Sequence, residues 1–140
     1  MKECFLYQIR LELEEKAAKD FILNNIQKHC TGLRTILTRE KAILISQFEA
    51  FTLFVKECEE NNQVNMPLYK WTKDTVENQS KKKKYLKSFT IYVDKQQLYK
   101  KNIADRLEKN ISSLNCKCIL KINKYDSNPR NNPQPPKKYF

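Results

Sequence analysis

The chain has 140 residues, 40% of them hydrophobic and 31% charged, which suits one domain with a modest core and excludes a disordered composition. Its formal net charge of +11 is concentrated in one half: residues 1–80 carry 11 Lys/Arg against 12 Asp/Glu, whereas residues 81–140 carry 16 against 4. Such a surface attracts polyanions, above all nucleic acid, because each neutralised phosphate releases counterions, and no apolar run approaches the ~20 residues that would span a bilayer.

The first 30 residues are predicted to form an added extension. Alternating Phe5, Tyr7, Ile9 and Leu11 favour a strand, and residues 14–29 place apolar side chains on one helical face. One long helix is the alternative. The N-terminus lacks the apolar core of a secretory signal and is too acidic for an Arg-rich transit peptide.

A second strand is predicted over residues 33–38, after a turn at Thr31-Gly32, with Leu33, Thr35 and Leu37 on one side and Arg34, Ile36 and Thr38 on the other. The following segment, KAILISQFEAFTLFVKECEE, predicts a helix of about four turns. Its apolar residues have a four-three-four-three spacing: Leu44, Phe48, Phe51, Val55 and Cys58.

Residues 63–78 read as an extended, irregular stretch, because Pro67 argues against a helix, and the lysines of residues 81–84 read as a connection. Alternation predicts strands at residues 88–93 and 116–124, with a helix between them from about residue 102 to 114. From residue 125 the proline-rich tail cannot build a regular element, so its order would have to come from a neighbouring molecule.

Residues 31–124 therefore predict an α+β domain with the order strand, helix, strand, strand, helix, strand. This is the ferredoxin-like plan, with a long basic hairpin between its second and third strands. The segments 1–30 and 125–140 would be an extension and a tail.

Several residues of this predicted domain have a familiar order and spacing. In TILTREKAILISQFEAFTLFVKEC they are Glu40-Lys41, Leu44, Ser46, Phe48, Phe51 and Lys56-Glu57, followed downstream by Pro67, Leu68, Lys82, Lys83 and Phe89. Residues 33–124 in this order resemble the ribosomal protein S-ten family, most of all its mitochondrial members. The family's arginine-threonine-histidine stretch and arginine-rich second strand are replaced by IYVDKQQL and KWTKDT, so those contacts are not carried over.

The resemblance implies a structural component of the mitochondrial ribosome, in the head of the small subunit and hence in the matrix. Its partners would be ribosomal RNA and neighbouring small-subunit proteins, with no cofactor and no small-molecule substrate. The lysines would act as point charges on phosphate, while Trp71 and Tyr85 would either stack on unpaired bases or pack under the hairpin. The candidate RNA-binding residues are Arg34, Arg39, Lys70, Trp71, Lys73, Lys81, Lys82, Lys83, Lys84, Tyr85, Lys87, Lys117, Lys121, Arg130, Lys137 and Lys138.

The sequence offers little to an enzyme or a metal site. Its five cysteines are scattered, which favours reduced structural thiols, and Cys116 and Cys118 are too close for the usual zinc spacing. His29 is the one histidine, and a single glycine excludes a glycine-rich phosphate loop. We expect no catalytic residues. The alternative function is a free-standing binder of single-stranded RNA, for which Tyr92 is the clearest exposed aromatic candidate.

Overall fold

The computed structural model describes residues 5–22 and 31–140, which form an α+β fold with one four-stranded antiparallel sheet and six α-helices. The strands are β1 (Tyr7–Leu13), β2 (Ala42–Ser46), β3 (Ser88–Val93) and β4 (Ile119–Asp126). The helices are α1 (Glu15–Ile22), α2 (Thr31–Arg39), α3 (Gln47–Glu60), α4 (Pro67–Glu77), α5 (Gln79–Leu86) and α6 (Lys101–Ser112), with short 3-10 turns at Pro129–Asn131 and Lys137–Tyr139. In this part of the chain no helix has the length and apolar character that a membrane span requires.

The strand β1 lies inside the sheet, whose order is β2-β3-β1-β4. It pairs with β3 on one side, where Arg10 is opposite Thr90, and with β4 on the other, where Arg10 is opposite Asn123. The predicted boundary at residue 30 would therefore separate β1 from the strands to which it is hydrogen-bonded. The prediction of a strand here is confirmed, but the strand is central.

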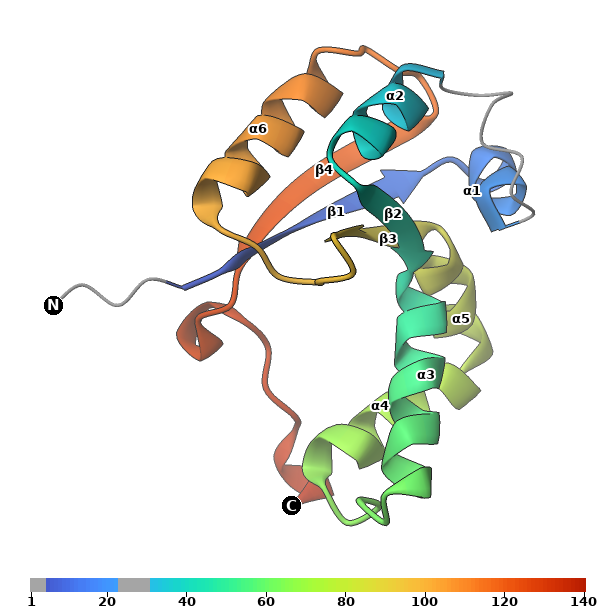
Figure 1. The fold of residues 1–140 in the computed structure, drawn as a ribbon. Coiled ribbons are helices and arrows are strands. Elements are labelled where there is room, and N and C mark those ends of the chain that lie inside the picture. The colour runs from blue at the N-terminus through green and yellow to red at the C-terminus, as the bar shows by residue number, and fades with distance from the viewer. Residues whose placement is uncertain (1–4, 23–30) are drawn as a thin grey trace, which may run out of the picture.

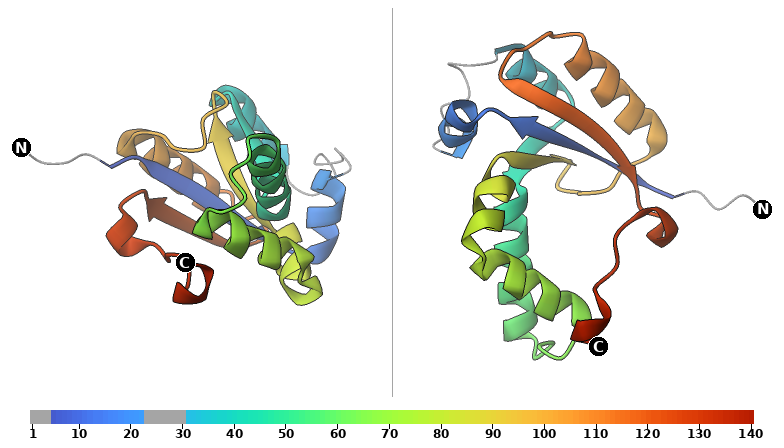
Figure 2. Two further views of the ribbon diagram at one scale, coloured as in Figure 1. Left: turned by 90° about the horizontal axis from the view of Figure 1, so that it is seen from below. Right: turned by 180° about the vertical axis from the view of Figure 1, so that it is seen from behind.

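The main core lies between the sheet and two helices, α2 and α6, which cover the same face (Figure 1). Alternate residues of β1 point into it, and Ile9, Leu11 and Leu13 are fully buried. Leu107 and Ile111 of α6 meet them from the helical layer. The second face of the sheet carries the intervening residues of β1 and looks toward α3, α4, α5 and the tail (Figure 2).

The strand predicted over residues 33–38 is wrong, because this segment is the helix α2. Its buried residues are Leu33, Ile36 and Leu37, which have helical spacing. The helical period of the apolar residues therefore decided the structure of this segment, although the same segment also alternates as in a strand. The turn predicted at Thr31-Gly32 is also absent, because the single glycine lies in α2 and has no positive φ. Gly32 instead lets α2 approach the end of α6, since a Cβ there would lie 2.6 Å from Cδ2 of Leu114.

The helix predicted from residue 41 begins later, because residues 42–46 form β2. Ser46 ends the strand and caps α3: its Oγ accepts a 3.0 Å hydrogen bond from the backbone N–H of Glu49. The predicted apolar stripe is thereby divided. Leu44 pairs with Ile91 in the sheet, whereas Val55 and Cys58 pack against Tyr69 in a second, smaller cluster.

The predicted extended stretch and the basic hairpin are also wrong, because residues 67–86 form α4 and α5. Pro67 stands at the first position of α4, where a missing N–H costs nothing. Asn78 caps α5 by accepting a hydrogen bond of 3.2 Å from the backbone N–H of Lys81. A helical arm made of α3, α4 and α5, residues 47–86, therefore connects β2 to β3 (Figure 1).

Tyr99 joins the sheet where β1 and β3 diverge. Beyond the Arg10–Thr90 pair, Ile9 does not bond directly to Ile91; its N–H donates to the Tyr99 hydroxyl at 2.7 Å, and that hydroxyl donates to the carbonyl of Ile91 at 3.0 Å. The backbone of Tyr99 pairs with Tyr7. Tyr99 thus closes the gap between two central strands, and burial raises its pKa to about 12.

Replacing Tyr99 by Phe removes this hydroxyl and leaves Ile9 N–H and the Ile91 carbonyl unsatisfied in the core. We expect a loss of about 1–3 kcal/mol in the free energy of unfolding at neutral pH. The folded chain holds the phenolic proton more tightly than the unfolded chain, so the contribution of Tyr99 is complete below about pH 10 and is lost as pH rises toward 12. Denaturant unfolding at pH 8 and pH 11 measures both effects. Equal alkaline loss in the variant and the parent would contradict this role.

Candidate nucleic-acid interface

A cleft of about 600 Å³ lies between the second face of the sheet and the helical arm. Its walls come from β1, α3, α4, α5, β4 and the first residues of the tail. The views in Figures 1 and 2 show why these segments meet: the arm leaves the sheet at β2 and returns at β3, and the tail runs from β4 toward α4. The cleft is therefore built from segments that are far apart in the sequence.

The floor of the cleft is a cationic and aromatic layer on β1 and β4. Arg10 places its guanidinium 4.6 Å from the ring centroid of Tyr125. Gln8 fixes the guanidinium from one side, because its Oε1 accepts a 2.6 Å hydrogen bond from Nε of Arg10, and its own amide donates to the carbonyl of Gln97 at 3.0 Å. Burial lowers the pKa of Arg10, but an arginine remains charged at neutral pH.

The arm contributes three aromatic side chains to the opposite wall: Phe51 from α3, Trp71 from α4 and Tyr85 from α5. Phe51 and Tyr85 meet edge to face with ring centroids 4.9 Å apart. The ammonium of Lys84 lies 5.2 Å from the centroid of Tyr85. Rings held in this way keep their faces in place, so little conformational freedom would be lost on stacking against a ligand.

The four lysines of α5 stand beside the cleft. Lys81, Lys83 and Lys84 are exposed, and Lys82 is partly buried with its ammonium 5.3 Å from the centroid of Phe48. None of the four forms an ion pair with a carboxylate of the described residues, and α5 contains no acidic residue. Like charges one turn apart weaken a helix, so this arrangement favours an anionic partner.

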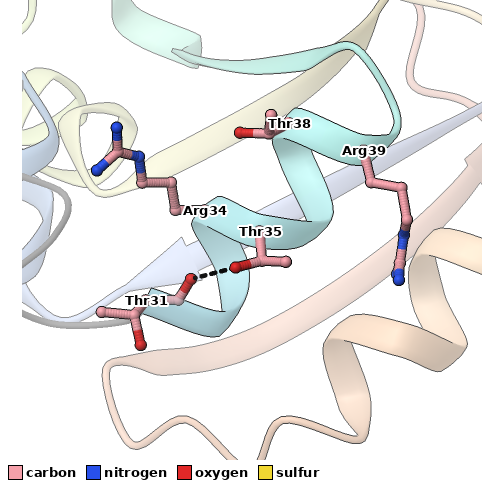
Figure 3. A pocket seen from close by; sticks show the side chains of 5 residues that line it. All are labelled: Thr31, Arg34, Thr35, Thr38 and Arg39. Carbon is pink, nitrogen blue, oxygen red and sulfur yellow. Dashed lines mark hydrogen bonds between the residues drawn. The ribbon is translucent and has the colours of Figure 1, made fainter.

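The other predicted residues are distributed over several surfaces. Arg34 and Arg39 are exposed on α2, where they line an open depression together with three threonines (Figure 3), and α2 covers the face of the sheet away from the cleft. Trp71, Lys81 and Tyr85 line the cleft. The remaining members lie outside its lining: Lys70, Lys73, Lys82, Lys83, Lys84, Lys87, Lys117, Lys121, Arg130, Lys137 and Lys138.

Lys73 is engaged within the arm. Its ammonium donates to Oε2 of Glu59 at 3.2 Å, and the same oxygen accepts a 2.7 Å hydrogen bond from Tyr69. Hydrogen bonds from Tyr69 and Lys73 lower the pKa of Glu59. These contacts join α3 to α4 at a half-exposed site, and they make Lys73 a weaker candidate for phosphate than the lysines of α5.

Four residues of the cleft lining were not predicted from the sequence: Gln8, Arg10, Gln47 and Tyr125. The available signal was the alternation in β1, where polar Gln8 and Arg10 interrupt apolar residues. That pattern indicates a second face of a strand, but it does not say whether solvent or another segment lies over it.

The cysteines do not assemble a metal site in the residues that the structure describes, where no group of three metal-ligating side chains occurs. The sulfurs of Cys116 and Cys118 lie 3.0 Å apart, and Cys58 is buried in the arm. The predictions for Cys4, His29 and Cys30 lie outside the described residues.

The tail makes contacts within the chain that its composition did not predict. Ser127 donates from its backbone N–H to the Leu6 carbonyl at 2.9 Å, and Asn132 donates from its side chain to the Asp126 carbonyl at 2.8 Å. At the far end the Tyr139 hydroxyl donates to Oδ2 of Asp74 on α4 at 2.6 Å. The tail thereby closes one side of the cleft.

Replacing Tyr139 by Phe removes the hydrogen bond to Asp74 and should release the end of the tail. We expect faster amide exchange in residues 129–140 while β1 and α6 exchange as before, because this contact is exposed and contributes only a small part of the free energy of unfolding. Hydrogen exchange followed by mass spectrometry measures the difference. Unchanged exchange in the tail would show that Tyr139 does not hold it.

No protein-family model, no curated protein and no solved structure matches this chain. Its function therefore has to be inferred from its own residues and their arrangement.

Proposed function

We propose that this chain is a non-catalytic RNA-binding component of the small subunit of the mitochondrial ribosome, of the S-ten type. The observation that carries the proposal is the group of four lysines on α5, Lys81–Lys84, which have no carboxylate partner among the described residues. Ribosomal RNA supplies phosphates at a density that would neutralise them. Neighbouring small-subunit proteins are the further partners.

The order of the elements supports the ferredoxin-like part of the proposal. Antiparallel strands in the order β2-β3-β1-β4, with helices between β1 and β2 and between β3 and β4, correspond to that plan. The correspondence requires β1 to be the first strand, in place of residues 33–38. The helical arm then occupies the position of the long hairpin, between the second and third strands.

The resemblance to the S-ten family is strongest at the end of the arm. Lys82 and Lys83 precede the third strand, and Phe89 lies within it, as the resemblance implies. Pro67 and Leu68 no longer support the resemblance, because they lie on α4 and the family has a strand there. The same holds for Glu40-Lys41, which follow the helix α2 where the family has its first strand, and for Leu44 and Ser46, which lie on β2 where it has its first helix. The proposed RNA contact accordingly rests on α5 and the cleft beside it.

A helix suits this role because it fixes the backbone from which the lysine side chains project, so that all four ammonium groups stay in one region. Lysine contacts to phosphate carry little sequence information, so they would position the protein on RNA of a given shape. The exposed Lys117 and Lys121 near the start of β4, together with the cations of the tail, would extend the positive surface.

A free-standing binder of single-stranded RNA is the second candidate. It is favoured by Tyr92 and Tyr125, which lie on the second face of the sheet, where ferredoxin-like proteins stack bases on aromatic rings. Sedimentation distinguishes the two: a ribosomal component travels with the small subunit, whereas a free-standing protein stays near the top of the gradient.

The test neutralises Lys81, Lys82, Lys83 and Lys84 together by replacement with Gln. We expect loss of co-sedimentation with the small subunit and a decrease of up to about 3 to 4 units in the salt dependence of RNA binding, because each phosphate contact contributes about 0.7–0.9 units. Glutamine keeps a good helix propensity, so thermal unfolding should change little.

The matched control changes four other exposed lysines, in α6 and the loop before it, to Gln: Lys95, Lys100, Lys101 and Lys109. It removes the same charge from another part of the molecule and should retain assembly. Equal loss in both variants would show that net charge acts without a defined surface, and normal assembly of the α5 variant would contradict the proposal.

A further inference from the structure

We propose that the cleft between the sheet and the helical arm binds one unpaired nucleotide of an RNA strand, with its base between aromatic walls and its phosphate near Lys81. The inference rests on the proposed RNA-binding function and adds a site for a base to a surface for phosphates. The cleft volume of about 600 Å³ lies within the usual range for small-ligand sites and is too small to admit a duplex.

The walls have the chemistry of a base-binding site. Trp71 and Tyr85 line the cleft from the arm, and Tyr125 lines it from β4. Stacking on a ring tolerates any base, because every base has a π-face. Arg10, which lies over Tyr125, adds a planar cation of the kind that stacks on bases or binds phosphate.

Buried polar side chains are concentrated at the same place. Of six buried polar residues among the described residues, four line the cleft: Gln8, Gln47, Thr72 and Thr75. Their orientations are set by neighbours. Gln47 Oε1 accepts a 2.6 Å hydrogen bond from Ser88, and the hydroxyls of Thr72 and Thr75 donate to carbonyls of their own helix at 2.7 and 3.0 Å. Positioned amides and hydroxyls are the groups that read the edge of a base.

The charge of the cleft favours a nucleotide. Arg10 and Lys81 are cationic, and Asp126 is the one carboxylate in the described lining. The Asp126 oxygens accept hydrogen bonds from Asn128 N–H at 3.1 Å and from the Asn131 side chain at 2.9 Å, so the tail already engages this charge. An extended peptide would need a free sheet edge, yet β1, which forms the floor, is paired on both sides.

Trp71 makes the test direct, because it is the only tryptophan of the chain and lines the cleft. The intact protein is titrated at low salt with a single-stranded RNA hexamer and, separately, with an abasic hexamer that carries the same phosphates. We expect the RNA to quench Trp71 fluorescence, and the abasic strand to bind more weakly without quenching.

Two variants, Tyr125→Leu and Tyr85→Leu, each remove one ring from the cleft and keep an apolar side chain. Each should weaken hexamer binding about 5- to 150-fold while leaving the affinity for the abasic strand unchanged. Tyr92→Leu is the control, because Tyr92 shares the sheet face but is absent from the cleft lining. Thermal unfolding identifies a variant that fails to fold, and the other variant then carries the test.

The outcomes separate this site from the proposed function. Equal binding of both strands without quenching would leave RNA binding intact and overturn the cleft as a base site. Loss in Tyr92→Leu but not in Tyr125→Leu and Tyr85→Leu would also overturn it and favour the open sheet surface. An acidic peptide that quenched Trp71 fluorescence as strongly as RNA would also overturn the cleft as a base site. If neither the RNA hexamer nor the abasic hexamer bound, the base site and the proposed RNA-binding function would both be overturned.

Discussion

The pairing of β1 with two neighbours at once is the constraint on which the rest of the structure depends. A strand paired on both sides must present its two faces to two different environments. Ile9 and Leu11 enter the core under α2 and α6, whereas Gln8 and Arg10 enter the cleft under the arm. One seven-residue segment therefore supplies both the centre of the hydrophobic core and the floor of the candidate site.

The arm is organised around its own small cluster, in which Val55, Cys58 and Tyr69 are buried. The hydrogen bonds from Tyr69 and Lys73 to Glu59 join α3 to α4 beside that cluster. A wall that is packed internally can stand away from the sheet without collapsing on it. This explains how a chain with a modest core can keep an open cleft lined by polar side chains, of which Gln8, Gln47, Thr72 and Thr75 are fixed by hydrogen bonds before any ligand arrives.

The charge of the chain is arranged in relation to that cleft. Other cations are neutralised by carboxylates. Arg106 of α6 pairs with Glu40 at the end of α2, which joins the two helices, and Lys124 of β4 pairs with Asp105 and Glu108 of α6, which joins the helical layer to the sheet. The lysines of α5 lack such partners in the described chain. Repulsion between these lysines therefore destabilises helix α5, and a bound phosphate would reduce that repulsion.

The sequence alone determined the α+β class, the strands at β1, β3 and β4, the helix α6 and the position of the positive charge, because each depends on a local period or on composition. Trp71, Lys81 and Tyr85 were found in the same way, as aromatic and basic residues near one another in the chain. The strand predicted over residues 33–38 was wrong because a helical and an alternating period overlap there. The helix starts at Ser46 and Pro67 were not predicted, because the first lies inside an apolar run and the second is at a proline.

Only the tertiary structure decided where β1 belongs, that the arm folds over the second face of the sheet, and that Arg10 meets Tyr125. Periodicity shows which side of a strand is apolar, but it does not identify the segment that covers the other side. That choice is made by long-range strand pairing and packing, between residues more than 100 positions apart in the case of β1 and β4. The physical reason is that such contacts depend on the energy of the whole arrangement, which no local window contains.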